Sequence, residues 1–261
     1  MENRFAPPDR LLIWAIPGLP EITAGTPLAE LLCGALEKQN LPIADRDVLV
    51  VAQKIVSKAE GRMVELKQVS PSPYAISVAE DFGKDPRQIE VVLRESRRIV
   101  RMDAGVIVVE THHGFVCANA GVDASNVPHG WVSLLPENPD ASACRLRDEI
   151  AAKTGKNVAV IISDTFGRPW REGLTNVAIG VAGVSPLLDY RGQRDEQGHL
   201  LSATVIATAD ELAAAAELVM GKTARRPAAI IRNFSWTEHA GNADGGGATE
   251  LIRPREKDLF R

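Results

Sequence analysis

The sequence contains three cysteines, and none of them belongs to a paired motif. Cys33, Cys117 and Cys144 lie far apart, and an odd number without a C-x-x-C spacing is typical of free thiols in a reducing compartment. No stretch approaches the roughly 18 consecutive apolar residues that a membrane-spanning helix needs. The first ten residues carry charges and two prolines where a signal peptide would have an apolar core. We therefore expect a soluble cytoplasmic protein with no membrane segment.

The sequence also has no excess of positive charge. The 30 Lys and Arg residues are outnumbered by 34 Asp and Glu residues, which gives a net charge of −4 and argues against a nucleic-acid-binding surface. Three common catalytic signatures are missing as well: the G-x-x-x-x-G-K-[ST] loop, the H-E-x-x-H zinc motif and the G-x-S-x-G serine motif. These absences exclude a Walker-type nucleotide site and argue against zinc or serine hydrolases.

Short aliphatic runs recur along the 261 residues, which suffice for one large domain or two intertwined halves. Aliphatic and β-branched runs bounded by Gly, Pro, Asp or Asn predict strands. The predicted strands cover residues 10–18, 47–52, 105–110, 114–120, 157–164, 177–183 and 227–233. Because 105–120 and 177–206 are dense in strands, we expect a mixed-sheet α+β fold instead of a doubly wound, Rossmann-type sheet.

Four segments have apolar residues at helical spacing. They are 27–39, 86–100, 138–155 and 210–221. We expect Thr26 to cap the first helix, with Pro27 at its first position. Asn138 is expected to cap the third helix and Gly155 to end it.

The chain is expected to form one domain over residues 1–240, followed by a C-terminal tail at 241–261. By composition, 241–250 is a flexible loop. Residues 251–261 are apolar enough that we expect them to dock against the domain.

The stretch CANAGVDASNV (117–127) places one carboxylate, Asp123, among small residues. Its side chain can close an Asx turn on its own backbone. It can equally bind a hard cation such as Mg²⁺ or Mn²⁺, with oxygens of Ser125 or Asn126 nearby. The stretch alone leaves both readings open.

A second carboxylate, Asp164, follows the apolar run VAVIIS and is next to Thr165. A carboxylate directly after a buried strand is costly unless it is paired or bound to a cation, although Asp164 can also cap a following helix. Two carboxylates at two strand ends could clamp one Mg²⁺ beside substrate phosphates, whose charge Arg168 and Lys58 would neutralise. These residues predict metal-assisted phosphoryl chemistry on a fold without a Walker loop.

Two further stretches carry weaker signals. PGLPEIT (17–23) is a stiff loop that could line a nucleotide, although a structural turn is the commoner role of such a loop. In VVAQKIVSKAEGR (50–62), Gln53, Lys54 and Lys58 follow a predicted strand. A lysine at a strand exit is a common phosphate ligand, but surface lysines are commoner still.

In order along the chain, these segments resemble the coenzyme F420:L-glutamate ligase family, also called F420-0 gamma-glutamyl ligases. The resemblance is carried by GLPEI, VVAQKIVSKAEGR, KDPRQIEVVLRES, THHGFVCANAGVDASNV, LLPENPDASA, VAVIISDTFGRPWREGLTNVAIGVAG and DELAAAAELVMGK. Of these, AGVDASNV and SDTFGRPWR contain the specific motifs. The resemblance implies an unusual α+β fold that forms an intertwined homodimer.

The resemblance also implies a reaction. GTP would phosphorylate the lactyl carboxylate of coenzyme F420-0, and the amine of L-glutamate would attack the acyl phosphate to give an amide. A further glutamate would follow through a γ-glutamyl linkage. Divalent cations, Mg²⁺ or Mn²⁺ and two per site, would neutralise the charge of the phosphoryl transfer, with K⁺ as an additional ion.

The family's site residues carry over onto matching positions of this sequence. Asp123 and Asp164 would hold one divalent ion, and Thr165 would reach the second. The implied GTP contacts are Leu19, Pro20, Glu21, Ile22, Gln53, Lys58 and Asn126. One departure concerns the second ion, because some members place an acidic residue where this chain has Lys222.

Two alternatives stay open. The same fold and metal site could serve a nucleotide- and metal-dependent acid–amine ligase that acts on a different carboxylate acceptor. The chain could also bind a nucleotide or cofactor without catalysis, although binding alone rarely needs a carboxylate-clamped metal ion beside phosphates.

Overall fold

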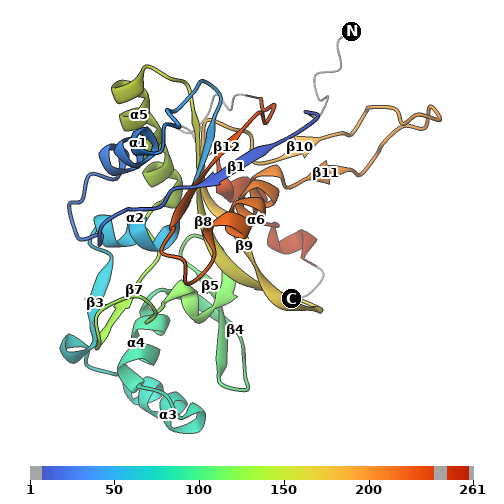
Figure 1. Ribbon diagram of the computed structural model, residues 1–261. Coiled ribbons are helices and arrows are strands. Elements are labelled where there is room, and N and C mark those ends of the chain that lie inside the picture. The colour runs from blue at the N-terminus through green and yellow to red at the C-terminus, as the bar shows by residue number, and fades with distance from the viewer. Residues whose placement is uncertain (1–7, 238–245, 259–261) are drawn as a thin grey trace.

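The architecture centres on a five-stranded mixed sheet (Figure 1). This computed structural model describes residues 8–237 and 246–258. The strand order is β1 (Leu12–Ala15), β12 (Ala228–Arg232), β2 (Val48–Ala52), β8 (Ala159–Arg168) and β9 (Arg171–Ala182). β2 and β8 run parallel, and the other neighbouring pairs of this sheet are antiparallel. The predicted mixed-sheet α+β class is therefore confirmed, whereas the intertwined homodimer stays a prediction.

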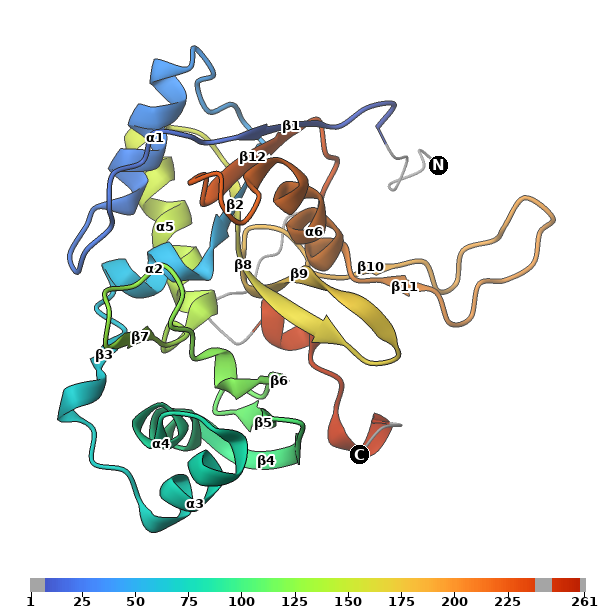
Figure 2. The ribbon, with the colours of Figure 1, turned by 60° about the horizontal axis from the view of Figure 1, so that its bottom comes forward.

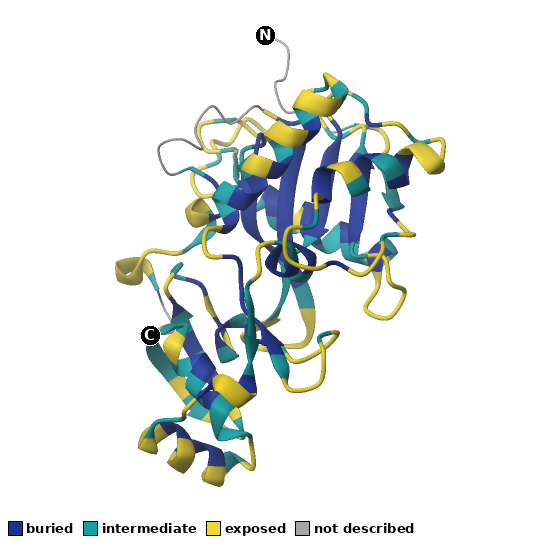
Figure 3. Ribbon diagram, turned by 90° about the vertical axis from the view of Figure 1, so that its left-hand side faces the viewer, coloured by how far each residue is buried: buried dark blue, intermediate teal, exposed yellow. Residues whose placement is uncertain are grey.

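Helices cover both faces of this sheet. On one face, α1 (Leu28–Lys38) and α5 (Pro139–Thr154) share a core with Leu49 and Val51 of β2. On the other face, α6 (Thr208–Met220) packs in a core that includes Val48 and Val50. Because successive side chains of a strand point to opposite faces, a strand between two helical layers must be apolar throughout. This explains the uninterrupted run VLVV and the dark blue central strands of Figure 3.

A smaller lobe lies at one end of the sheet (Figure 2). It consists of α3 (Pro73–Phe82), α4 (Pro86–Arg94) and a three-stranded sheet of β4 (Ser96–Asp103), β5 (Val106–Thr111) and β6 (Val116–Ala118). A separate core fills it, with Ile89, Ile107 and Val132 at its centre. The lobe matters for the site because the chain that leaves β6 leads directly into the Asp123 loop.

Shorter elements complete the described chain. They are α2 (Gln53–Ala59), the paired strands β3 (Met63–Glu65) and β7 (Trp131–Ser133), and the 3₁₀ turns η1 (Leu66–Gln68), η2 (Asn119–Gly121), η3 (Ala248–Leu251) and η4 (Arg255–Lys257). A further pair, β10 (Leu188–Asp189) and β11 (Val205–Ile206), begins an arm that extends away from the body (Figure 1). Among the described helices, none combines the length and the apolar character that a membrane crossing requires.

Two of the four predicted helices are confirmed nearly to the residue. α5 begins with Pro139 behind Asn138, whose side chain accepts a hydrogen bond from the Ala141 amide at 3.0 Å, and it ends at Gly155 in the left-handed conformation. α6 begins at Thr208, two residues before the predicted start, and ends before Gly221.

The other two helix predictions need correction. α1 begins at Leu28, so Pro27 precedes the helix, and the Thr26 hydroxyl donates to the Thr23 carbonyl at 2.6 Å instead of capping it. The helix predicted over 86–100 ends at Arg94, and the chain continues as β4. Pairing of β4 with β5 overrides the helical pattern there, since it satisfies the backbone of an Ile-Val segment that favours strands.

The predicted boundary at residue 240 and much of the predicted flexible loop at 241–250 lie outside the described residues. Beyond them, Ala248 is fully buried in the core on the α6 side of the sheet, and Ile252 packs against the core on the other side. Of the segment 251–261, Leu251 and Ile252 therefore dock as expected, whereas residues 253–257 are exposed. The division into a domain and a tail stays a prediction.

A buried ion pair ties the start of β2 to the end of β12. Asp47 is fully buried, and its carboxylate accepts hydrogen bonds from Arg232 Nε at 2.8 Å and Nη2 at 2.7 Å, and from the Ala44 amide at 2.8 Å. Removing one partner of such a pair leaves the other charge buried without compensation. The pair therefore stabilises the edge of the sheet only while it is complete.

Asp47→Ala is predicted to lower the free energy of unfolding by about 1–3 kcal/mol, because it removes the buried acceptor of the Ala44 amide and of the partly exposed Arg232 guanidinium. Urea denaturation measures the change. The control is Asp189→Ala, which removes a surface pair with Arg191 and is expected to leave the midpoint unchanged. Equal midpoints for the two variants would contradict the prediction.

Candidate functional site

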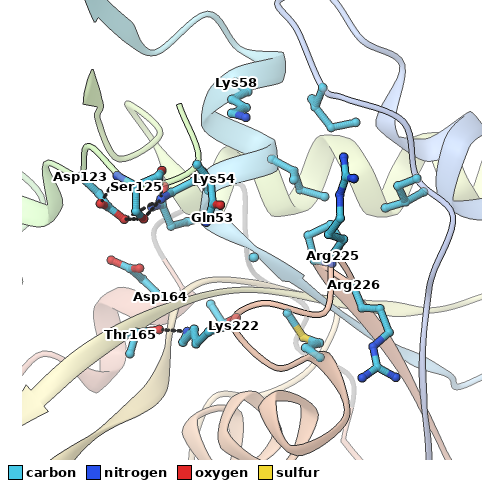
Figure 4. A pocket seen from close by; sticks show the side chains of 18 of the residues that line it. Gln53, Lys54, Lys58, Asp123, Ser125, Asp164, Thr165, Lys222, Arg225 and Arg226 are labelled. Atoms are coloured by element: carbon cyan, nitrogen blue, oxygen red, sulfur yellow. Dashed lines mark hydrogen bonds and ion pairs between the residues drawn. The ribbon is translucent and has the colours of Figure 1, made fainter. Parts of the chain in front are cut away.

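A cavity of about 910 Å³ lies beside the end of β2 and the middle of β8 (Figure 4). All ten residues that the sequence analysis assigned to nucleotide or metal line it. They are Leu19, Pro20, Glu21, Ile22, Gln53, Lys58, Asp123, Asn126, Asp164 and Thr165. Their roles stay predictions, but segments separated by up to 146 positions meet in one place of a size typical for small-molecule sites.

The start of α2 positions one wall of the cavity. The chain passes from β2 into this helix without a loop, so Gln53 is at the first helical position. Residues four apart on a helix lie on the same face. Lys54 and Lys58 therefore both reach the cavity, while Ser57 is buried and donates a hydrogen bond to Gln53 Oε1 at 2.9 Å. The helix presents two ammonium groups, one turn apart.

Lys58 contacts the loop that the resemblance assigns to GTP. Its Nζ lies 2.5 Å from Glu21 Oε1, and its side chain is 11% exposed whereas that of Glu21 is 70% exposed. The exposed carboxylate can leave this pair more easily than the buried lysine. A phosphate group could then take the place of Glu21 beside the Lys58 ammonium.

Asp123 closes an Asx turn, which is one of the two readings of its loop. Its Oδ1 accepts a hydrogen bond from the Ser125 amide at 2.7 Å, and its Oδ2 accepts one from the Ser125 hydroxyl at 2.8 Å. Lys54 Nζ lies 2.5 Å from the same Oδ2 and also donates to the Ser125 carbonyl at 2.6 Å. Burial alone would raise the pKa of Asp123, but these hydrogen bonds outweigh it and hold the pKa below its ordinary value.

Asp164 faces Asp123 across the cavity from the middle of β8 (Figure 4). The strand continues to Arg168, so Asp164 and Thr165 lie within the strand and neither caps a helix. The pKa of Asp164 is raised to about 6. Burial is the main cause and the Asp123 carboxylate adds to it, while the Thr165 amide and the ammonium groups of Lys222 and Lys54 oppose the rise. Two carboxylates thus share one partly buried space.

Thr165 belongs to a polar cluster at the lower edge of the cavity. Its hydroxyl donates to Asn176 Oδ1 at 2.7 Å and accepts a hydrogen bond from Lys222 Nζ. The Asn176 amide donates to Glu217 Oε2 at 3.0 Å. The cluster joins the β8–β9 hairpin to the end of α6.

Sequence reasoning missed several residues of the cavity wall. Asn176, Glu217, Arg225 and Arg226 line it, and neither arginine has a hydrogen bond or salt bridge to another described residue. For Arg225 and Arg226, the only signal in the sequence was that two adjacent arginines lie between a predicted helix and a predicted strand. Arg168 is the opposite case, because its guanidinium donates to the Glu172 carbonyl in the β8–β9 hairpin, away from the residues that line the cavity. Its predicted contact with phosphate stays a prediction that this cavity does not support.

Comparison with known proteins assigns the chain to a family. A model described as F420-0:Gamma-glutamyl ligase matches residues 18–233. The chain belongs to this family. One relative, the coenzyme F420:L-glutamate ligase of Methanothermobacter thermautotrophicus, is 48% identical over 94% of this chain and 97% of its own length. Relatives of the same name from Methanopyrus kandleri and Archaeoglobus fulgidus are 45% and 40% identical, over 96% and 97% of this chain and 98% and 97% of their own lengths.

The first of the two divalent ions implied by the resemblance to F420-0 gamma-glutamyl ligases fits the residues present, because Asp164 has no salt bridge to a described residue, although Lys54 already contacts Asp123 Oδ2. Mg²⁺ commonly takes one or two carboxylates and completes its shell with water and substrate phosphates. A cation between Asp123 and Asp164 would offset the burial and the mutual repulsion that raise the pKa of Asp164. Beside Asp164, the Ser163 hydroxyl is buried and has no hydrogen-bond partner among the described residues. The described part of the chain holds no group of three His, Cys, Asp or Glu side chains that could bind a metal ion alone.

The second divalent ion does not fit. Thr165, its implied ligand, is in contact with the ammonium group of Lys222, which also lies 3.3 Å from Asn176 Oδ1 and 3.4 Å from Glu217 Oε1. The oxygen atoms of Thr165, Asn176 and Glu217 that would bind the second ion therefore already surround the positive charge of Lys222.

Asp164→Asn is predicted to raise the free energy of unfolding of the metal-free protein at neutral pH. In the folded protein the pKa of Asp164 is raised to about 6, above its unfolded value of about 3.9. The contribution of Asp164 to stability is therefore most favourable below about pH 3.9, and it is lost as the pH rises through about 6. An asparagine does not ionise and escapes this loss. The expected gain is up to about 3 kcal/mol at pH 7.5 and near zero at pH 4.

Urea unfolding in the presence of EDTA at both pH values measures this gain. The control is Asp189→Asn, since Arg191 lowers the pKa of that exposed carboxyl to about 2 and its loss brings no gain at pH 7.5. A stability difference for Asp164→Asn that is the same at both pH values would contradict the prediction.

Proposed function

We propose that the protein is a GTP-dependent ligase that joins L-glutamate to coenzyme F420-0, first through an amide and then through a γ-glutamyl linkage, in coenzyme F420 biosynthesis. One observation carries the proposal: a single cavity gathers the ten residues that the resemblance implies for GTP and metal. The names of the relatives, coenzyme F420:L-glutamate ligases, supply the acceptor and the amino acid. The resemblance adds a homodimer to the proposal, which sedimentation analysis tests, and the cysteine pattern adds a cytoplasmic location.

The charges of the cavity suit anionic substrates. Lys54 and Lys58 present two ammonium groups from one face of α2, and an ammonium group neutralises phosphate charge. Arg225 and Arg226 line the same cavity, and a planar guanidinium binds a carboxylate or a phosphate with two parallel hydrogen bonds. GTP, F420-0 and glutamate all carry such groups.

The proposed reaction has two steps. The terminal phosphoryl group of GTP moves to the lactyl carboxylate of F420-0, which gives GDP and an acyl phosphate. The glutamate amine then attacks the carbonyl carbon, loses a proton and forms the amide as inorganic phosphate leaves. A divalent ion held by Asp123 and Asp164 would neutralise the charge that develops on the phosphoryl oxygens.

Two residues prepare the cavity for this transfer. Lys54 fixes the Asp123 side chain through its 2.5 Å contact with Oδ2, and the Ser125 amide fixes the other oxygen. The oxygens of Asp123 therefore keep one orientation before a substrate binds. Such preorganisation lowers the cost of assembling charged groups at the moment of reaction.

Purified protein incubated with F420-0, L-glutamate, GTP and Mn²⁺ or Mg²⁺ is expected to yield F420 species with added glutamyl units. Mass spectrometry detects them, and controls omit GTP or replace it with ATP. Absence of product with GTP, or equal product without any nucleotide, would contradict the proposal. Product with a different carboxylic acid but not with F420-0 would reassign the acceptor.

Asp164→Asn is expected to reduce turnover by at least about 100-fold while the protein stays folded, because the amide keeps the side-chain volume but loses the negative charge that holds the cation. Circular dichroism checks the fold, and Asp189→Asn serves as the matched control with unchanged turnover. Near-normal turnover of the Asp164 variant would refute its role as a metal ligand.

A further inference from the structure

The side chain of Lys222 ends in a cage of oxygen atoms. Its Nζ donates to Thr165 Oγ1, lies 3.3 Å from Asn176 Oδ1 and lies 3.4 Å from Glu217 Oε1. Gly221 ends α6 with a positive φ of 62°, and the chain turns there so that Lys222 lines the cavity. Figure 4 shows the ammonium group next to Thr165, below Asp164. Three donors of one ammonium thus meet three acceptors from three elements of the fold, β8, β9 and α6.

The arrangement of the three oxygens does not depend on Lys222 alone. The Asn176 side chain is buried, and its amide nitrogen donates to Glu217 Oε2 at 3.0 Å, so its carbonyl oxygen is directed toward Lys222. The Thr165 hydroxyl donates to that carbonyl at 2.7 Å, which leaves its lone pairs for a cation. A hydroxyl, an amide carbonyl and a carboxylate are the hard oxygen ligands that a divalent cation would use.

We infer that the Lys222 ammonium group takes the place of a second metal ion, so that the site binds one divalent ion per chain. Asp123 and Asp164 would hold the divalent ion, and Lys222 supplies a fixed single charge within the same cavity. This inference rests on the proposed function, since it concerns the same nucleotide site.

Position and charge both support this assignment. Lys222 lines the same cavity as Asp123 and Asp164, and its ammonium group donates to the hydroxyl of Thr165, the residue next to Asp164. A second divalent ion among these oxygens would lie within contact distance of a like charge, which repels it. The lysine side chain is 60% exposed and lines the cavity, so its ammonium group is accessible to a substrate phosphate.

The test counts the manganese ions that bind to each chain. Purified protein is dialysed to equilibrium against Mn²⁺ and GDP, and the Mn²⁺ retained with the protein is measured against the protein concentration. The wild-type protein is expected to bind one Mn²⁺ per chain. Lys222→Glu, which turns the ammonium into a fourth oxygen ligand, is expected to bind two.

Two further variants control the experiment. Lys38→Glu makes the same charge change at an exposed position at the end of α1, outside the cavity, and is expected to keep one Mn²⁺. Lys222→Gln removes the ammonium without adding a charge and is expected to bind a second ion more weakly than Lys222→Glu. Thermal melting curves establish that each variant is folded.

The outcomes separate the inference from the proposed function. Two Mn²⁺ per wild-type chain would overturn the role of Lys222 and leave the ligase proposal intact. One Mn²⁺ in both wild type and the two Lys222 variants would also overturn it, because the three oxygens would then form no cation site. No Mn²⁺ in any protein would refute the metal-dependent nucleotide site itself, and the inference with it.

Discussion

The parallel pairing of β2 with β8 is the contact on which the site depends. Its register places Ala52 opposite Ser163, so the first turn of α2 and the Asp164 side chain emerge next to each other. Parallel strands present corresponding ends at the same edge of a sheet, and groups that follow one strand meet groups of the other. Lys54 and Asp164 owe their proximity to this register, and a shift by one residue would turn Asp164 toward the opposite face of the sheet.

The second constraint is the placement of negative charge in a partly buried space. Asp123 is stabilised by Lys54 and the Ser125 amide, which lower its pKa, whereas burial raises the pKa of Asp164. Two neighbouring carboxylates with opposite shifts form an environment that favours a cation, because only added positive charge relieves the repulsion between them. The fold tolerates this cost at the site, as proteins commonly accept strain where function requires it.

The chain supplies much of the positive charge of the cavity from its own side chains. Lys54, Lys58, Lys222, Arg225 and Arg226 all line one cavity in a protein of net charge −4. Net charge therefore says little about a site that needs only a few local donors. The Lys222 ammonium differs from the others because it is surrounded by oxygens at a position where the resemblance implies a metal ion. Because the charge of a lysine side chain is covalently attached, it cannot dissociate, and the site would need fewer bound metal ions.

Much of this protein follows from the sequence by itself. The apolar runs predicted the strands of the mixed sheet, and Asn138 and Gly155 marked the ends of α5. Short motifs indicated the family and ten of the residues that line the cavity. These features are local, since capping, burial and motif spacing act over a few residues. Only the tertiary structure decided that residues 96–103 form a strand, that Arg168 lies outside the cavity, and that Lys222 reaches Thr165, Asn176 and Glu217. The first two depend on strand pairing that overrides local preference, and the contacts of Lys222 with Thr165 and Asn176 join segments whose separation in the sequence carries no signal of their contact.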